Sequence, residues 1–126
     1  GLQAVARTDS HMQAVAAALA GPHVAVIAVT HSGSSKEMVD ALRLAREVGA
    51  ATICITSFTE SPVTGYADVV LQSAAAETMF RSEAMASRIA QLSIVDVLVV
   101  CAGLARMDRS LEALERVSRA LALKRF

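Results

Sequence analysis

Apolar and polar positions along the chain fall into blocks that predict strands followed by helices. The clearest block begins with the apolar run at residues 23–29, which predicts a buried strand. A short polar stretch follows, and after it apolar residues recur at helical spacing: Met38, Val39, Ala41, Leu42 and Ala45. This pattern predicts a strand, a turn and a helix that ends near Val48, with Gly49 as its C-terminal cap.

The rest of the chain repeats this alternation. The predicted strands span residues 2–6, 23–29, 51–56 and 68–72, and helices are predicted at 11–20, from the turn to 48, at 79–104, and from a break at Met107 and Asp108 to about 123. Thr8, Asp9 and Ser10 are candidate caps of the first helix, and Ser10 with Gln13 fits a capping box. Strands that alternate with helices imply right-handed crossovers and a doubly wound α/β sandwich.

Composition bounds the fold and some functions. The chain has 126 residues, enough for one domain, and is 54% hydrophobic but only 3% aromatic, so Ala, Val, Leu and Ile must form its core. Its 12 basic and 12 acidic side chains cancel. A chain without a basic field is a poor DNA-binding candidate by itself.

Several features indicate a soluble, cytoplasmic protein without metal or cofactor. Cys54 and Cys101 lie in apolar runs, which predicts buried free thiols. The apolar run at 94–105 is interrupted by Asp96 and is too short to span a bilayer. We expect Asp96 to be hydrogen-bonded or at a wet interface, because burying an unpaired carboxylate is costly. No residue spacing suggests a metal site, a nucleophilic triad or a dinucleotide-binding loop.

The polar octet at residues 30–37 follows the first clear strand and opens a helix. It carries the hydroxyls of Thr30, Ser32, Ser34 and Ser35, and Gly33 would let backbone approach a ligand without a Cβ. Exposed N–H groups and the partial positive charge of a helix start attract anions, phosphate in particular. The same residues also read as a capping box, with Ser34 as the cap and Glu three residues on, which would serve stability alone.

The octet resembles a family signature. Thr30-x-Ser32-Gly33-x-Ser35-x-Glu37 is similar to the S-x-S-G-x-T-x-[DE] motif of the SIS (sugar isomerase) domain, with Thr and Ser exchanged at the ends. The resemblance implies a three-layer αβα sandwich with a parallel, flavodoxin-like sheet. It also implies that Thr30, Ser32 and Ser35 hold the phosphate of a phosphosugar with their side chains, and Gly33 and Ser34 with backbone N–H groups.

Further segments resemble the sensor domains of bacterial RpiR-type transcription regulators. They are the D-x-H-x-Q segment at 9–13, the A-D-V-V-L strand at 67–71, and a helix with F-R-S at 80–82, S-R-x-A-Q-L at 87–92 and Asp96. The resemblance implies a phosphosugar effector, and its D-x-H segment makes Asp9 and His11 candidate sugar contacts. Glu77 follows a predicted strand end on the ligand side and would either contact the sugar or lie in solvent, and Ser82 would either contact the sugar or cap the long helix. His31 is expected to be a partly exposed turn residue. A domain this small with apolar helices is also expected to associate as a homodimer or tetramer.

The chain departs from the family pattern at its start. SIS domains open with a helix and a strand that ends in a G-x-G-x-S turn, and nothing here matches them. We therefore expect residues 1–126 to be a partial SIS domain. The family's central strand, between those predicted at 2–6 and 23–29, would be missing. The helix–turn–helix domain of RpiR proteins is also absent, so DNA would be bound only through that domain.

Three functions remain open from the sequence. The favoured one is a non-enzymatic, phosphosugar-sensing domain that controls an attached DNA-binding domain. The alternative is an aldose–ketose isomerase of sugar phosphates, in which Glu77 and His11 are the candidate acid and base. The third is a non-catalytic structural module with a vestigial site. Hydroxyls and amides that recognise phosphate do not identify the sugar.

Overall fold

The computed structural model describes residues 2–75 and 85–123. The chain forms two compact units, one spanning Ala6–Ile94 and the other made of the two ends of the chain, up to Val5 and from Val95. The elements are α1 (Ser10–Ala18), β1 (Ala25–Val29), α2 (Lys36–Glu47), β2 (Ala51–Thr56), the 3-10 helix η1 (Pro62–Tyr66), β3 (Val69–Gln72), α3 (Met85–Leu104) and α4 (Met107–Ala122).

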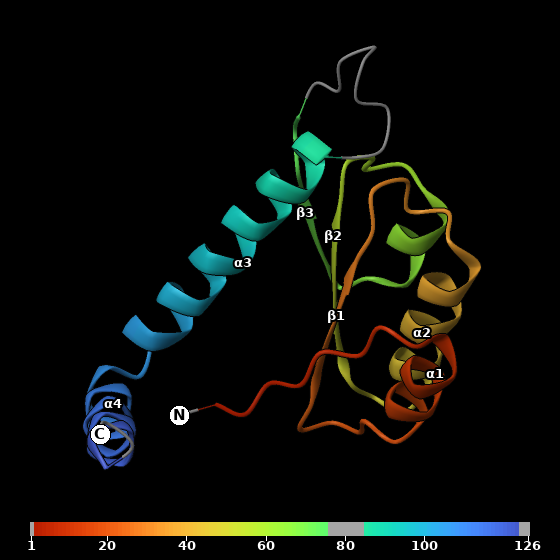
Figure 1. Ribbon diagram of the computed structural model, residues 1–126. Helices are drawn as coiled ribbons and strands as arrows, with labels where there is room; N and C mark the ends of the chain where they lie inside the picture. The colour runs from red at the N-terminus through yellow and green to blue at the C-terminus, as the bar shows by residue number, and fades with distance from the viewer. Residues whose placement is uncertain (1, 76–84, 124–126) are drawn as a thin grey trace. The chain divides into compact units, whose positions relative to one another are not determined.

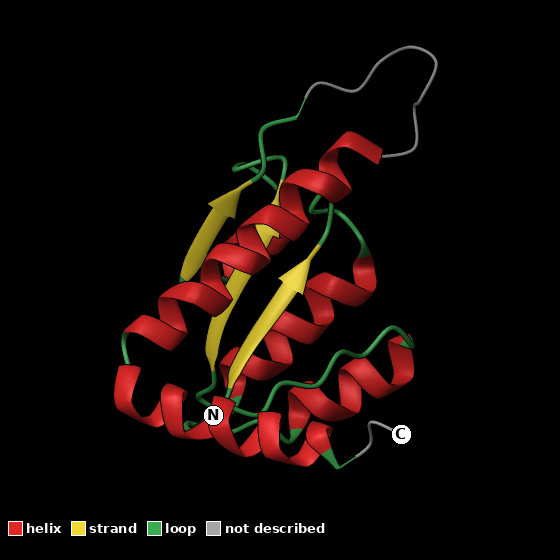
Figure 2. Ribbon diagram, turned by 60° about the vertical axis from the view of Figure 1, so that its left-hand side comes forward, coloured by secondary structure: helices red, strands yellow, loops and turns green. Residues whose placement is uncertain are grey.

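The first unit contains a parallel sheet of three strands in the order β1-β2-β3 (Figure 2). In its register Ala28 lies opposite Cys54, and Cys54 lies opposite Val70. The predicted bounds of β2 are confirmed, and those of β1 and β3 differ only at the starts of the strands. A parallel sheet of this kind needs cover on both faces.

Helices lie on both sides of this sheet. Helices α1 and α2 lie together on one side, and residues 85–94 of α3 lie on the other (Figures 1 and 2). The predicted αβα layering is confirmed. Beneath α2, Leu42, Cys54 and Val63 are fully buried in one cluster with Ala28. A second cluster joins α1 to α2 through alanines, whose small side chains allow close approach: Ala17, Ala41, Ala45 and Ala50.

The C-terminus of α2 is closed as the sequence predicts. Gly49 has φ +80, a left-handed conformation that glycine adopts without strain. The Gly49 N–H donates to the Arg46 carbonyl at 3.0 Å, and the Ala50 N–H donates to the Ala45 carbonyl at 3.0 Å. These two bonds form a Schellman motif, which satisfies carbonyls that the helix end leaves free.

Two sequence predictions near the start of the chain are wrong. Residues 2–6 form no strand, and a strand needs a neighbour for its backbone groups, which these residues lack in the described structure. Asp9, not Ser10, caps α1, because its carboxylate oxygen accepts a hydrogen bond from the Met12 N–H at 2.9 Å.

Asp68 joins the start of β3 to β2. One of its carboxylate oxygens accepts hydrogen bonds from both the N–H and the hydroxyl of Thr52, each at 2.8 Å. The backbone bond first, and the hydroxyl bond second, lower the pKa of Asp68 below its ordinary value. The ionised carboxylate is therefore the form that supports this strand pairing.

This contact predicts a component of acid sensitivity. The stabilisation from Asp68 is complete above the unfolded-state pKa of about 4 and is lost as the pH falls through the lower folded-state pKa. We expect Asp68→Asn to lower stability at pH 7 and to weaken the loss of stability as the pH falls below about 4. Urea unfolding over this pH range measures both effects, with Asp96→Asn, at an exposed position on α3, as the control. An acid dependence identical to that of the unsubstituted chain would contradict the prediction.

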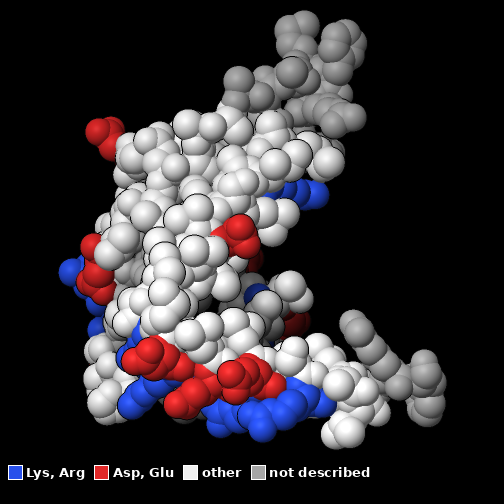
Figure 3. All heavy atoms as spheres, turned by 90° about the vertical axis from the view of Figure 1, so that its left-hand side faces the viewer, with Lys and Arg blue, Asp and Glu red and all other residues white. Residues whose placement is uncertain are grey.

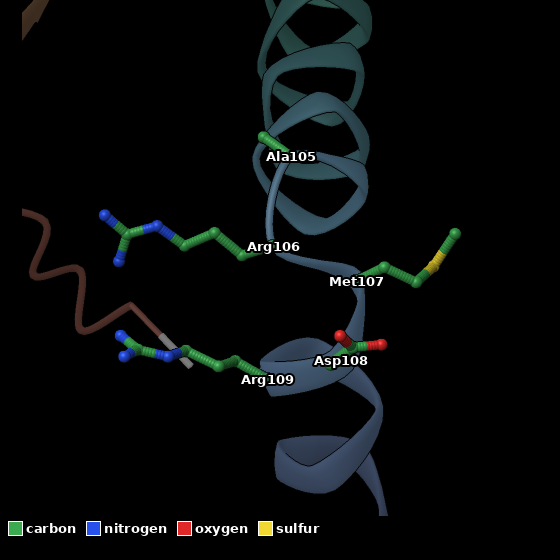
Figure 4. A pocket seen from close by; sticks show the side chains of 5 residues that line it. All are labelled: Ala105, Arg106, Met107, Asp108 and Arg109. Atoms are coloured by element: carbon green, nitrogen blue, oxygen red, sulfur yellow. The ribbon is translucent and has the colours of Figure 1, made fainter.

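The second unit contains the end of α3 and α4. The break between them falls at Ala105 and Arg106, two residues before the predicted Met107 and Asp108. The Ser110 hydroxyl donates to the Gly103 carbonyl at 3.0 Å across the break. Beside it lies a shallow cavity of about 380 Å³, lined by Ala105, Arg106, Met107, Asp108 and Arg109 (Figure 4). Both arginines point to one side and Met107 to the other. None of the predicted site residues lines this cavity.

Helix α4 is amphipathic, and none of its residues is buried. Its apolar stripe is more than half exposed and consists of Leu111, Leu114, Val117 and Leu121. On the face shown in Figure 3, acidic and basic side chains lie next to one another on α4. No uniformly basic stripe forms on this face.

Two expectations about α3 are wrong. Cys101 is exposed, whereas Cys54 is buried as predicted, and both thiols are free. Asp96 is exposed to solvent, which agrees with the expectation that it is not buried without a partner. With 20 residues and a mean hydropathy of 1.7, α3 is long and apolar enough to cross a membrane by those measures, unlike the shorter run considered in the sequence. Core helices of globular proteins meet the same criterion. The buried Ser87 and Gln91 place the first half of α3 in the α/β unit.

Candidate anion-binding site

The octet forms the turn between β1 and α2, at the carboxyl end of the sheet. Thr30 continues β1 by one residue, because its N–H donates to the Ile55 carbonyl at 3.0 Å. Its side chain is buried, and its hydroxyl oxygen accepts a hydrogen bond from the Gly33 N–H at 3.3 Å. The Thr30 hydroxyl, predicted to hold phosphate, therefore braces the turn from inside in this structure.

Gly33 is required by packing as well as by backbone conformation. Its φ is +67, in the left-handed region. A Cβ at this position would collide with the Ser61 side chain and would lie 3.2 Å from the Thr56 hydroxyl. The Gly33 carbonyl also accepts a hydrogen bond from the Val63 N–H at 3.0 Å. The sequence suggested a glycine for close approach of a ligand, whereas here the close approach is to the loop before η1.

The predicted capping box at the start of α2 does not form. The N-cap is Ser35 instead of Ser34, and its side chain makes no capping hydrogen bond. The Ser34 N–H donates to the Ser32 hydroxyl at 3.2 Å, and the Ser34 hydroxyl donates to the Ser32 carbonyl at 3.3 Å. All three serines are exposed. The first N–H groups of α2 therefore lie beside serine hydroxyls and are not satisfied by a cap, which suits an anion.

Charges at this helix start are partly compensated. The Lys36 ammonium lies 2.7 Å from an Asp40 carboxylate oxygen, and this hydrogen-bonded pair raises the pKa of Lys36 and lowers that of Asp40. Glu37 lies in the same first turn. Because Lys36 is paired, an anion at this turn would interact mainly with the backbone N–H groups and the positive end of the helix dipole.

A second group of polar side chains follows the three strands at the same edge of the sheet. His31 follows β1, and its Nδ1 lies 3.0 Å from the Ser57 hydroxyl, which follows β2. That hydroxyl lies 3.1 Å from the hydroxyl of Ser73, which follows β3. His31 is half-buried, as predicted. Its ring packs edge-on against the ring of Phe58, with 5.7 Å between the ring centroids. Sequence reasoning did not group Ser57 and Ser73 with the octet, although each directly follows a predicted strand.

Gln91 is a further residue that sequence reasoning missed. It lies on α3, is buried, and its side-chain amide donates to the Thr30 carbonyl at 3.2 Å. The S-R-x-A-Q-L segment at 87–92 was the available signal, but nothing in that pattern alone points to the octet.

Two of the four predicted sugar contacts, Asp9 and His11, lie among the described residues. Asp9 is exposed and caps α1, and His11 is exposed on the same helix. No hydrogen bond among the described residues joins either of them to the octet. Glu77 and Ser82 lie outside the described residues.

Comparison with known families shows the family to which the chain belongs. The family model described as "SIS domain" matches residues 2–101. The chain belongs to the SIS domain family. The matched residues include the octet, which forms the turn between β1 and α2 and the first residues of α2.

Two curated relatives of this SIS domain are described as uncharacterised HTH-type transcriptional regulators. TTE0211 of Caldanaerobacter subterraneus subsp. tengcongensis is 35% identical over 118 residues, which are 94% of this chain and 42% of the relative. YbbH of Bacillus subtilis is 42% identical over 97 residues, which are 76% of this chain and 34% of the relative. The chain therefore spans less than half the length of either relative.

Solved structures share the fold. The Vibrio vulnificus NanR protein complexed with ManNAc-6P superimposes with a TM-score of 0.78 at 28% identity, covering 95% of this chain and 47% of NanR. The sugar isomerase domain of an RpiR transcription factor from Sphaerobacter thermophilus gives a TM-score of 0.70 at 23% identity, covering 94% of this chain and 62% of that domain. The second likeness concerns the fold alone.

Proposed function

We propose that this SIS domain is the phosphosugar sensor of a cytoplasmic transcription regulator of sugar metabolism and is not an enzyme. The observation that carries the proposal is the start of α2, where Ser35 caps the helix without using its side chain. The phosphate would lie there, held by the Ser32 and Ser35 hydroxyls and by backbone N–H groups of the turn. The likeness to regulators, and to a NanR protein complexed with ManNAc-6P, supports this choice.

The remaining site residues have different roles in this proposal. Thr30 shapes the turn from its buried position. Gly33 and Ser34 would supply their backbone N–H groups, which in the structure donate to the Thr30 and Ser32 hydroxyls at 3.3 and 3.2 Å. Asp9, His11, Glu77 and Ser82 stay candidates for sugar contacts. DNA would be bound by a helix–turn–helix domain joined to this one, and ligand binding would shift the population of its arrangements by differential affinity.

Calorimetry with a panel of hexose, pentose and aminosugar phosphates, including ManNAc-6P, tests the proposal. We expect binding of at least one phosphosugar, no binding of its dephosphorylated counterpart, and no interconversion of aldose and ketose phosphates over hours of incubation. Turnover would assign the domain to the isomerases. Failure of every phosphosugar to bind would refute a sensing role for this chain.

Self-association is a further part of the proposal. The exposed apolar stripe of α4 suits a symmetric contact with a second copy, as in most soluble homo-oligomers. We expect light scattering at micromolar concentration to give a mass of at least two chains. Leu114→Glu, within the stripe, should shift the mass toward one chain, whereas Glu112→Gln, on the charged face, should not. A single-chain mass for the unsubstituted protein would contradict this prediction.

A further inference from the structure

Helix α3 buries polar residues and exposes apolar ones. Its only buried residues in the described part are Ser87 and Gln91, which are 0% and 8% exposed. Ile89 and Leu92, by contrast, are 67% and 68% exposed. Ser87 and Gln91 are four residues apart and so share one face of the helix. The start of α3 lies beside the carboxyl ends of the strands (Figure 1). Ser87 and Gln91, together with the half-buried Ala90 and Ile94, therefore form the face of this helix that is covered in the α/β unit.

One residue of this face of α3, Gln91, contacts the octet. Gln91 donates to the Thr30 carbonyl at 3.2 Å, and this bond is buried and joins segments 61 residues apart in the chain. Thr30 is also held through its N–H by Ile55 and through its hydroxyl by Gly33. All three polar groups of Thr30 are therefore engaged, and Gln91 supplies the contact that comes from α3.

We propose that Gln91 is a positioning residue that fixes the shape of the phosphate turn and couples its occupancy to the position of α3. The inference rests on the proposed function, because it concerns the same turn. A displaced Thr30 would move its hydroxyl and the Gly33 N–H that donates to it, and with them the backbone of the turn. Coupling is reciprocal, so a ligand that favours the ordered turn must also favour the docked form of α3.

A purely structural role for Gln91 makes different predictions. A buried carboxamide that only satisfies its own hydrogen bonds would change folding stability without changing the response of α3 to ligand. Direct contact with a sugar would change affinity for a phosphosugar but not for inorganic phosphate. A positioning role changes affinity for both probes by the same factor, because it acts on the phosphate turn.

The first experiment compares the unsubstituted chain with Gln91→Leu, using calorimetry with ManNAc-6P and with inorganic phosphate. We expect Gln91→Leu to weaken both by the same factor, about three- to tenfold, the order of one hydrogen bond. Hydrogen exchange of residues 85–94 should slow when ManNAc-6P binds the unsubstituted chain and should slow less in Gln91→Leu. Ser93→Ala is the control, because the Ser93 hydroxyl donates to the Ile89 carbonyl within the same helix and is exposed.

The second experiment uses Gln91→Glu, which also serves if Gln91→Leu does not fold. An ionised glutamate only accepts hydrogen bonds, whereas a protonated one can donate to the Thr30 carbonyl. With sulfate as the probe, whose charge is constant over this range, the affinity of Gln91→Glu relative to the unsubstituted chain should recover as the pH falls below about 6, where a buried glutamate protonates.

The outcomes separate this inference from the function on which it rests. Unchanged affinity for both probes in Gln91→Leu, or an unchanged exchange response of α3, would overturn the positioning role while leaving phosphosugar sensing intact. A pH-independent defect in Gln91→Glu would overturn it as well. Failure of the unsubstituted chain to bind either probe would instead refute the proposed function.

Discussion

Replacing Gly33 with alanine is expected to destabilise the folded chain by about 2–5 kcal/mol and to abolish phosphosugar binding at the turn. The left-handed conformation at φ +67 costs an alanine about 1–2 kcal/mol. The collision of its Cβ with Ser61 adds the cost of overpacking, about 1–3 kcal/mol. Ser61 must then move, which displaces the η1 loop or the turn itself.

Two controls separate these contributions in chemical denaturation. Gly49 has φ +80 but nothing within 4 Å of an added Cβ, so Gly49→Ala should show the conformational cost alone. Adding Ser61→Gly to Gly33→Ala removes the colliding side chain. The double variant should therefore recover the part of the free energy of unfolding that is lost to overpacking. Equal costs for Gly33→Ala and Gly49→Ala would show that the contact with Ser61 relaxes freely.

Removal of the Ser32 and Ser35 hydroxyls together is expected to weaken phosphosugar binding by about 1–3 kcal/mol, or about 5- to 150-fold. Each hydroxyl would bond to a charged phosphate oxygen, and such bonds are stronger than those between neutral groups. The Ser35 side chain makes no capping hydrogen bond that would compete with phosphate. The Ser32 hydroxyl accepts a hydrogen bond from the Ser34 N–H at 3.2 Å. Folding stability should change little, because both side chains are exposed.

Calorimetry with ManNAc-6P measures this effect in Ser32→Ala/Ser35→Ala. Ser34→Ala is the matched control, since the proposal assigns Ser34 a backbone contact and its hydroxyl donates only to the Ser32 carbonyl. An unchanged affinity in the double variant would remove the phosphate from this turn, even if the chain binds a phosphosugar elsewhere.

The hydrophobic pattern predicted the secondary structure well where the signal for a strand or helix lies within that element. The β-branched run of β2 and the glycine cap of α2 are both local signals, and both are confirmed. The strand predicted at residues 2–6 is wrong because an apolar sequence does not supply a neighbouring strand. The predicted burial of Cys101 is wrong for a related reason, since an apolar run does not show which face of a helix is covered.

The residue types of the octet predicted the place of the candidate site, but not the hydrogen bonds within it. The octet was identified from its hydroxyls and its place between a strand and a helix. That Thr30 faces inward, and that Ser35 caps α2 without a side-chain bond, depends on how the turn closes. Gln91 could not be assigned to the turn, because its contact with Thr30 is made only once the fold brings α3 to the end of β1.

The unequal environments of the two thiols make the natural sequence a ready substrate for single-site labelling. Burial raises the pKa of the Cys54 thiol, which leaves less of the reactive thiolate, while Cys101 is exposed on α3. A maleimide fluorophore or nitroxide would therefore attach at Cys101 without any engineered cysteine. Such a reporter would sit on the helix that Gln91 anchors, where changes in its spectrum during a titration would follow the movement of α3 directly.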